Sequence, residues 1–96
     1  MLLDFSPLEQ TDLEAIGDYI VQDSPGNATR FVESLREQYE KITRALMTYL
    51  VRQDLDDGLR SCASGRYFIF FRPLFDDVRI VRILHSAIDV NAVNLN

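Results

Sequence analysis

The sequence predicts an α+β fold: a short N-terminal strand, then an antiparallel helical hairpin packed on a small antiparallel sheet of the C-terminal strands. Residues 8–20 and 28–49 repeat apolar side chains at three-to-four spacing, with a short break between them. From Leu59 onward the chain is rich in β-branched and aromatic residues between turn signals. The 96 residues and 47% hydrophobic content are typical of a single domain, residues 1–96, with one compact core.

The first elements follow from local signals. Met1–Phe5 is short and apolar apart from its fourth residue, so we expect a strand there. Ser6 can cap the next helix, Pro7 suits its first position, and Glu9 is expected to complete a capping box. The break at residues 24–27, Ser-Pro-Gly-Asn, supplies a second helix start. With so short a connection, the two helices should fold back on each other as a hairpin.

The second half is expected to form three strands. The first is Leu59–Ala63. The second, Arg66–Arg72, carries apolar side chains on both faces, which is typical of an interior strand covered on both sides. Val78–Leu84 is the last strong strand, after a hairpin turn. The polar tail, residues 86–96, is expected either to pack loosely or to end as a short helix.

Composition and charge exclude several classes of protein. The formal net charge is −5, whereas a protein that binds nucleic-acid phosphates needs a basic field, so no direct nucleic-acid binding is expected. Residues 58–96 nevertheless hold five arginines and three acids, so an acidic partner would meet that part. The single cysteine excludes an internal disulfide and a cysteine-based zinc cage. We expect no metal, no cofactor and no membrane span, and we read the chain as cytoplasmic.

Short motifs in both halves of the chain give a family resemblance. The opening Phe5-Ser6-Pro7 and the segment at residues 12–16, Asp-Leu-Glu-Ala-Ile, precede a second group of motifs. These are Gly58-Leu59-Arg60, residues 64–72, residues 78–85 ending in Leu-His, and Asp89. In their order and spacing they resemble the ParE branch of the RelE/ParE toxin superfamily, over nearly the whole chain. The sequence departs from the family at Met47–Val51, at Phe71 and at Ser86.

The resemblance implies the toxin half of a bacterial type II toxin–antitoxin pair. Its partner would be a cognate antitoxin that wraps the toxin surface, in a heterotetramer or larger complex. Characterised ParE-like toxins inhibit DNA gyrase by binding it, whereas RelE-like relatives cut mRNA on the ribosome. Gyrase inhibition is the leading interpretation, with no catalytic residue of the chain's own. A RelE-type endoribonuclease and a degenerate toxin that only binds its antitoxin remain alternatives.

Candidate target-binding residues lie in the second half, because arginine presents a planar set of donors suited to carboxylates. Five arginines alternate with apolar residues there, and several should share one solvent-facing side. Within this set the candidates for gyrase contact are Arg60, Arg72, Arg79, Arg82 and His85. The alternative for the arginines is that they keep exposed strands soluble. For His85 it is a hydrogen bond at a strand end, because no nucleophile or second metal ligand accompanies it.

Candidate antitoxin-binding residues lie on the helical hairpin, whose apolar side chains an amphipathic segment would cover together with a free sheet edge. They are Leu8, Ile16, Ile20, Phe31, Leu35 and Tyr39. The acids Asp12, Glu14 and Asp18 are expected on a solvated helix face rather than as paired catalytic carboxylates. Cys62 is expected to be a small buried side chain. The aromatic run at residues 67–71 is expected to be a core strand rather than a base-stacking platform.

Overall fold

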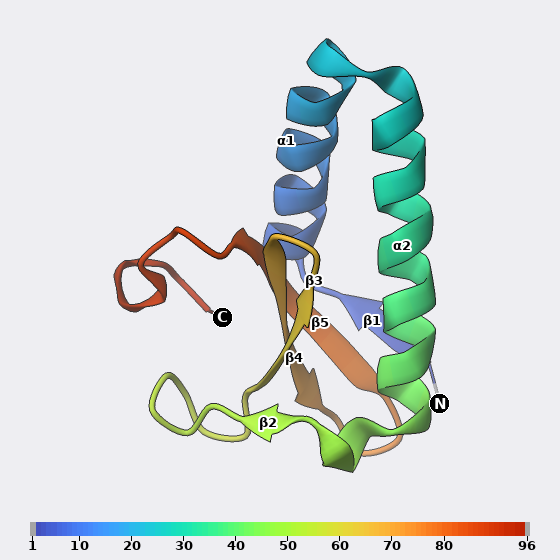
Figure 1. Cartoon of the computed structure of the whole chain (residues 1–96). Coiled ribbons are helices and arrows are strands. Elements are labelled where there is room, and N and C mark those ends of the chain that lie inside the picture. The colour runs from blue at the N-terminus through green and yellow to red at the C-terminus, as the bar shows by residue number, and fades with distance from the viewer. Residues whose placement is uncertain (1, 96) are drawn as a thin grey trace.

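Two helices cover one face of a five-stranded sheet, which confirms the predicted α+β fold (Figure 1). The structure is a computed structural model, and it describes residues 2–95. The elements in chain order are β1 (Leu3–Phe5), α1 (Pro7–Asp23), α2 (Pro25–Arg44), a 3₁₀ turn (Leu46–Thr48), β2 (Leu50–Val51), β3 (Arg60–Ser64), β4 (Tyr67–Pro73), β5 (Val78–His85) and a second 3₁₀ turn (Val90–Ala92).

Helix α1 begins at the predicted cap, but the expected capping box is wrong. The Ser6 hydroxyl accepts a hydrogen bond from the Glu9 backbone N–H at 3.0 Å, and Pro7 takes the first helical position. The Ser6 backbone N–H, which a capping box would leave for Glu9, donates instead to the Ile80 carbonyl in β5 at 3.0 Å. The Glu9 carboxylate is therefore released from the helix end, and it accepts a hydrogen bond from the Tyr39 hydroxyl of α2.

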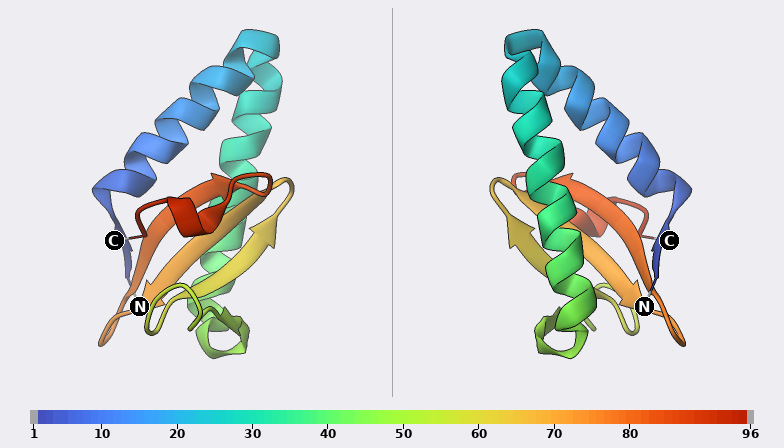
Figure 2. Two further views of the ribbon diagram at one scale, coloured as in Figure 1. Left: turned by 90° about the vertical axis from the view of Figure 1, so that its left-hand side faces the viewer. Right: turned by 90° about the vertical axis from the view of Figure 1, so that its right-hand side faces the viewer.

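A single residue joins the two helices. Ser24 ends α1 by donating its backbone N–H to Ile20, and its hydroxyl caps α2 by accepting from Asn27. This confirms the predicted hairpin. Its closed end extends beyond the sheet in both views of Figure 2, while the opposite ends of α1 and α2 lie against the strands.

Helix α2 ends earlier than the apolar repeat predicts. The repeat runs to Tyr49, whereas the helix stops at Arg44. The chain then makes the 3₁₀ turn and pairs Leu50 and Val51 with β3 as the short strand β2, which was not predicted. Leu46 and Tyr49 still pack on the core, and the Tyr49 ring meets Phe71 edge-on at 5.5 Å. The apolar spacing therefore continues because both segments face the same core, although only the first is helical.

The sheet has the strand order β1-β5-β4-β3-β2. The three predicted C-terminal strands are confirmed within about one residue at each end, and they pair antiparallel. The N-terminal strand is also confirmed, with Met1 outside the described residues. It adds to β5 in parallel, a pairing that the sequence did not indicate. Strand β4 is central, as its two apolar faces predicted.

The β3–β4 turn depends on one glycine. Ser64 pairs with Tyr67, which leaves a two-residue loop. Its first residue, Gly65, has φ of 58°, a left-handed conformation that other residues rarely adopt. Glycine at this position suits the tight hairpin turns that match strand twist.

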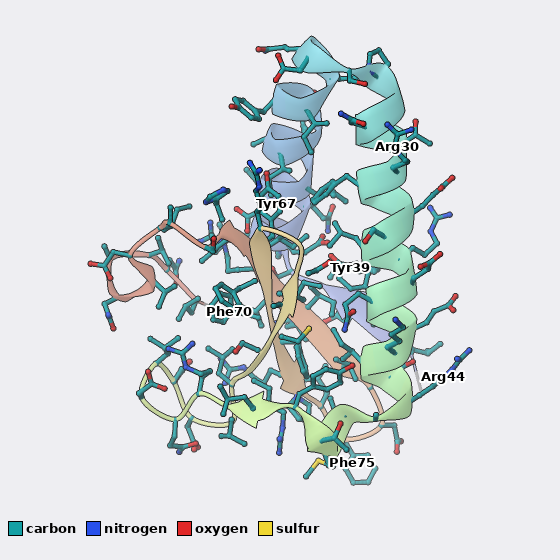
Figure 3. The ribbon with its side chains drawn as sticks, viewed as in Figure 1. Arg30, Tyr39, Arg44, Tyr67, Phe70 and Phe75 are labelled. Atoms are coloured by element: carbon teal, nitrogen blue, oxygen red, sulfur yellow. The ribbon has the colours of Figure 1, made fainter. Side chains whose placement is uncertain are left out.

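Two apolar clusters cover the two faces of the sheet. The cluster on the helix face joins α2 residues such as Leu35 and Ile42 to Ile69 and Phe71 of β4. The opposite cluster centres on Phe70, which points toward the side of the C-terminal tail in Figure 3. That tail, predicted to pack loosely or to form a short helix, forms the second 3₁₀ turn and covers this second face. The side chains covering Phe70, Val81 and Leu84 there are Leu55, Val90, Val93 and Leu95.

We predict that the tail contributes to folding stability. Leu95 is 8% exposed, so Leu95→Ala should lower the free energy of unfolding by about 2–3 kcal/mol, through lost burial and a partly filled cavity. Leu2→Ala is the matched control, because Leu2 is 72% exposed and the change should cost about 0.5 kcal/mol or less. Urea denaturation measures both, and equal losses would show that the tail does not pack as described.

Candidate functional site

The Asp12–Arg82 pair joins α1 to the sheet. Asp12 Oδ2 accepts from Arg82 Nε at 2.7 Å, and Oδ1 accepts from Nη2 at 2.7 Å. Only 14% of the Arg82 side chain and 11% of the Asp12 side chain are exposed. These bonds from Asp12 raise the pKa of Arg82, and burial opposes them. The prediction that Asp12 lies on a solvated helix face is therefore wrong, whereas Glu14 and Asp18 are exposed as expected.

The same pair lies at a bulge in β5. Phe71 pairs with Ile80 and Phe70 with Arg82, so Val81 is an extra residue in the ladder. The Ser6 hydroxyl donates to the Val81 carbonyl at 2.6 Å, and the Ile83 N–H donates to Asp12 at 3.1 Å. Side chains at the start of α1 therefore satisfy backbone groups at the bulge.

Arg82 also holds the C-terminal tail. Its Nη1 donates to the Asn94 carbonyl at 2.6 Å. Arg82 was predicted to contact a target, but its guanidinium is already bonded to two segments of its own chain. Substituting it would disturb the fold as well as any target contact.

Two further predicted arginines share the helix-free face of the sheet with Arg82. Arg72 and Arg79 are cross-strand neighbours, and each has an acidic partner. Arg72 bonds Asp56 at 2.8 Å and lowers the pKa of that carboxyl, while Arg79 bonds Asp4 at 2.7 Å. Several arginines therefore do share one side, as predicted, but acids from the first half of the chain neutralise their charge. The Arg79–Asp4 pair is nearly half exposed, so a partner's carboxylate can compete for Arg79.

Arg60 lies on the opposite face from these arginines. Its cross-strand neighbour is Phe71, which belongs to the helix-side cluster. Arg60 donates to the Tyr49 carbonyl at 2.8 Å and contacts the Met47 sulfur, and its buried Nε has no partner among residues 2–95. No described carboxylate forms an ion pair with it. Arg60 and Arg82, both members of family-like motifs, therefore cannot form one continuous contact patch.

His85 lines a hollow of about 490 Å³ where α1, the end of β5 and the tail meet. Its ring meets Tyr67 edge-on at 5.4 Å, and its Nδ1 accepts the Ala87 backbone N–H at 3.0 Å. This is the hydrogen-bonding role that was the alternative for His85. Arg66, which forms no ion pair among the described residues, lies on the same hollow.

A second hollow, of about 440 Å³, opens between β1, α1 and α2. Its walls are mainly apolar and include Leu3, Phe5, Leu13 and Leu35. Its floor holds the Glu9 carboxylate, whose Oε2 accepts from the Tyr39 hydroxyl at 2.7 Å. We call this cavity the hairpin hollow.

The hairpin hollow shifts the pKa values of its two buried polar groups. Burial raises the pKa of Glu9, the bond from Tyr39 lowers it, and the nearby Asp12 carboxylate adds to the rise. Burial and the Glu9 carboxylate raise the pKa of Tyr39 far above its ordinary value, so the phenol stays protonated and donates.

The residues predicted to bind the antitoxin fall into two groups. Leu8, Ile16, Ile20 and Phe31 are half-buried along the hairpin. Leu35 and Tyr39 are only 2% and 6% exposed, and both line the hairpin hollow. A partner would therefore meet Leu35 and Tyr39 only through this hollow.

Cys62 and the aromatic run in β4 lie in surroundings typical of structural residues. Cys62 is half-buried, and burial raises the pKa of its thiol to about 11, which leaves it unreactive at neutral pH. The side chains of Ile69, Phe70 and Phe71 are fully buried, as expected for a core strand. Within residues 2–95, no three His, Cys, Asp or Glu side chains gather as a metal site requires. No described helix is long and apolar enough to cross a membrane.

The fold and these motifs agree with a comparison against known protein families. A family model described as "ParE toxin of type II toxin-antitoxin system, parDE" matches residues 3–90. The chain belongs to the ParE toxin family. Among solved structures, this ParE-family chain resembles a chain of the "Chromosomal ParDE TA system from P. aeruginosa", with a TM-score of 0.74 and 25% identity over 88% of this chain and 95% of that one. A comparison with curated proteins finds no match.

Two acids of this ParE-family toxin acquire roles that sequence reasoning missed. Asp12 and Glu9 were assigned to solvent and to a helix cap, because spacing along a helix does not identify a partner on another element. One signal was present for Asp12. It lies on the first-helix motif of the family resemblance and Arg82 on the last-strand motif, so the two were candidates for a pair.

We predict that Arg82→Ala lowers the free energy of unfolding by about 3 kcal/mol, because it leaves the largely buried Asp12 carboxylate without its cationic partner. Arg79→Ala is the matched control. Its ion pair is 47% and 43% exposed, so the loss should stay below about 1 kcal/mol. Urea denaturation of the two variants decides, and similar losses would contradict the structural role of Arg82.

A second prediction concerns pH. Because the pKa of Glu9 is raised on folding, the folded chain holds its proton above pH 4.5, where the unfolded chain releases it. Wild-type stability should therefore fall relative to Glu9→Gln as pH rises from 4.5 through the raised pKa, and the difference between the two should stop changing with pH below 4.5. Glu14→Gln, at an exposed position of α1, should show no such dependence. A Glu9→Gln difference that does not change with pH would contradict the prediction.

Proposed function

We propose that this ParE-family chain is a toxin that inhibits DNA gyrase by binding it, and that a cognate antitoxin neutralises it. The observation that carries the proposal is the family match over residues 3–90, together with a shared fold over 88% of the chain. ParE-family toxins generally act by binding rather than catalysis. Gyrase as the target and neutralisation by the antitoxin are the parts that need experiment.

The helical hairpin is the surface that we assign to the antitoxin. It offers the hairpin hollow, and beside it β1 is the last strand of the sheet, so one side of β1 is unpaired within the sheet. An antitoxin segment with a helical part and an extended part can lay an amphipathic helix over the hairpin and add a strand at β1. This would cover half-buried residues such as Ile16 and Phe31.

The charge distribution favours binding over RNA cleavage. Stabilising a phosphate in a cleavage reaction needs clustered cations. The hollow that holds His85 contains two arginines, and one of them, Arg82, is paired with Asp12. Arg66 is the cation that remains there among the described residues. A RelE-type ribonuclease is therefore disfavoured. It remains an alternative to be tested, together with a degenerate toxin that only binds its antitoxin.

Among the predicted target residues, we favour the helix-free face of the sheet. Arg79 is about half exposed, and a target carboxylate can replace its weak surface pair with Asp4. Arg82 would act indirectly, by holding the tail and α1. Arg60 and His85 face the helix side of the sheet, so they would contact a different part of the target.

We predict that the purified, antitoxin-free chain inhibits gyrase supercoiling or traps cleaved DNA, and that adding the antitoxin restores activity. Arg79→Ala should weaken inhibition, whereas Arg44→Ala should not, because Arg44 lies exposed on α2 away from the sheet face. Supercoiling and cleavage assays at equal concentrations of folded protein measure both effects.

Absence of gyrase inhibition by a folded sample would contradict the proposed target. Translation-dependent mRNA cleavage would then separate the two alternatives, because only the ribonuclease produces it. Equal inhibition by wild type and Arg79→Ala would instead move the target surface away from the helix-free face.

A further inference from the structure

The Glu9 carboxylate is a buried acceptor with unused capacity. Glu9 is 2% exposed, yet its side chain lines the hairpin hollow. Tyr39 donates to Oε2, and no side chain or backbone N–H among residues 2–95 donates to Oε1. Oε1 is not among the buried side-chain atoms that lack a partner, so it is reached from the hollow that Glu9 lines. Oε1 is therefore available to a donor entering the hollow.

The rest of the hairpin hollow suits an aliphatic chain. Phe5, Leu13 and Leu35 line it, and its volume of about 440 Å³ is within the range of ligand pockets. Figure 3 shows Tyr39 pointing from α2 toward the sheet, and its hydroxyl donates to Glu9 Oε2 at 2.7 Å. A side chain with a long apolar stem and a hydrogen-bond donor at its end would pack against the apolar walls and bond the Glu9 carboxylate.

The Glu9 carboxylate determines the sign of the charge inside the hairpin hollow. At the rim, Arg36 and Glu40 are both exposed and carry opposite charges, so neither sign dominates there. Residues 1–57, which build the hollow, hold twelve acids and five bases. An anionic group would be repelled, and a purely aliphatic one would bury Oε1 without a donor.

We propose that the antitoxin inserts one lysine or arginine side chain into the hairpin hollow, with its methylene stem against Phe5, Leu13 and Leu35 and its cationic N–H group on Glu9 Oε1. The inference rests on the proposed function, because it names the antitoxin as the occupant. Lysine and arginine bury such stems while their charged heads bond elsewhere. A charge-assisted hydrogen bond is stronger than a neutral one.

The first test measures the affinity of the antitoxin for three toxins: wild type, Glu9→Gln and Glu40→Gln. Glu9→Gln keeps the size of the side chain and an oxygen for Tyr39 but removes the charge, and it should weaken binding at least about tenfold. Glu40→Gln makes the same change at the exposed rim, so it should alter affinity less than about twofold. Unfolding curves confirm that each variant is folded.

The second arm replaces each lysine and arginine of the antitoxin with methionine, one at a time. One of these variants should bind wild-type toxin at least about tenfold more weakly, yet lose nothing further against Glu9→Gln. If Glu9→Gln binds as tightly as wild type, or if every antitoxin variant loses the same factor with both toxins, the inference is wrong.

A third arm needs no antitoxin. n-Butylguanidinium should shift the methyl NMR signals of Leu13 and Leu35 in the wild type at lower concentration than neutral n-butylurea, and Glu9→Gln should remove that preference. Equal responses to both probes would overturn the inference. Failure of the wild type to bind any antitoxin would overturn the proposed function and the occupant with it, whereas a complex insensitive to Glu9→Gln overturns this inference alone.

Discussion

The contact between Asp12 and Arg82 is the interaction on which the other parts of this structure depend. It joins α1 to the bulge in β5, and Arg82 extends the connection to the tail through the Asn94 carbonyl. Ser6 reinforces the junction from the start of α1 by bonding the Ile80 and Val81 carbonyls. The helical hairpin, the sheet and the tail are thereby held in one arrangement. Asp12 and Arg82 themselves line the hollow that holds His85, while the hairpin hollow includes Glu9 and Leu13 from the same part of α1.

This junction also determines which charges remain for partners. The second half of the chain is rich in arginine, but Asp4, Asp12 and Asp56 neutralise three of them. The surface available to a target is therefore less basic than the linear sequence indicates. On the hairpin side an acidic group remains available, because one oxygen of the Glu9 carboxylate has no donor among residues 2–95. We therefore assign a weakly paired arginine face to the target and an acidic, mainly apolar hollow to the antitoxin.

Local signals in the sequence predicted most of the fold. The helix start at Ser6 and Pro7, the break at Ser24 and the two-faced apolar pattern of β4 each depend on residues close together in the chain. Such local features can be predicted from the sequence pattern. The end of α2 at Arg44 was not predictable in this way, since Leu46 and Tyr49 reach the same core from a 3₁₀ turn. The partners of Asp12 and Glu9 are 70 and 30 residues away, and helical spacing carries no information about them. Leu35 and Tyr39 were selected for their apolar face, which correctly placed them on the hairpin but did not show that they are buried.

A double-mutant cycle on Asp12 and Arg82 tests the central role of their contact most directly. The free energy of unfolding would be measured for the wild type, Asp12→Ala, Arg82→Ala and the double variant. If the pair joins α1 to the sheet, the double variant should lose clearly less stability than the sum of the two single losses, because each single change leaves a largely buried charge without its partner and the second change removes that charge. A loss in the double variant equal to the sum of the single losses would show that the two side chains act independently, and would contradict this account.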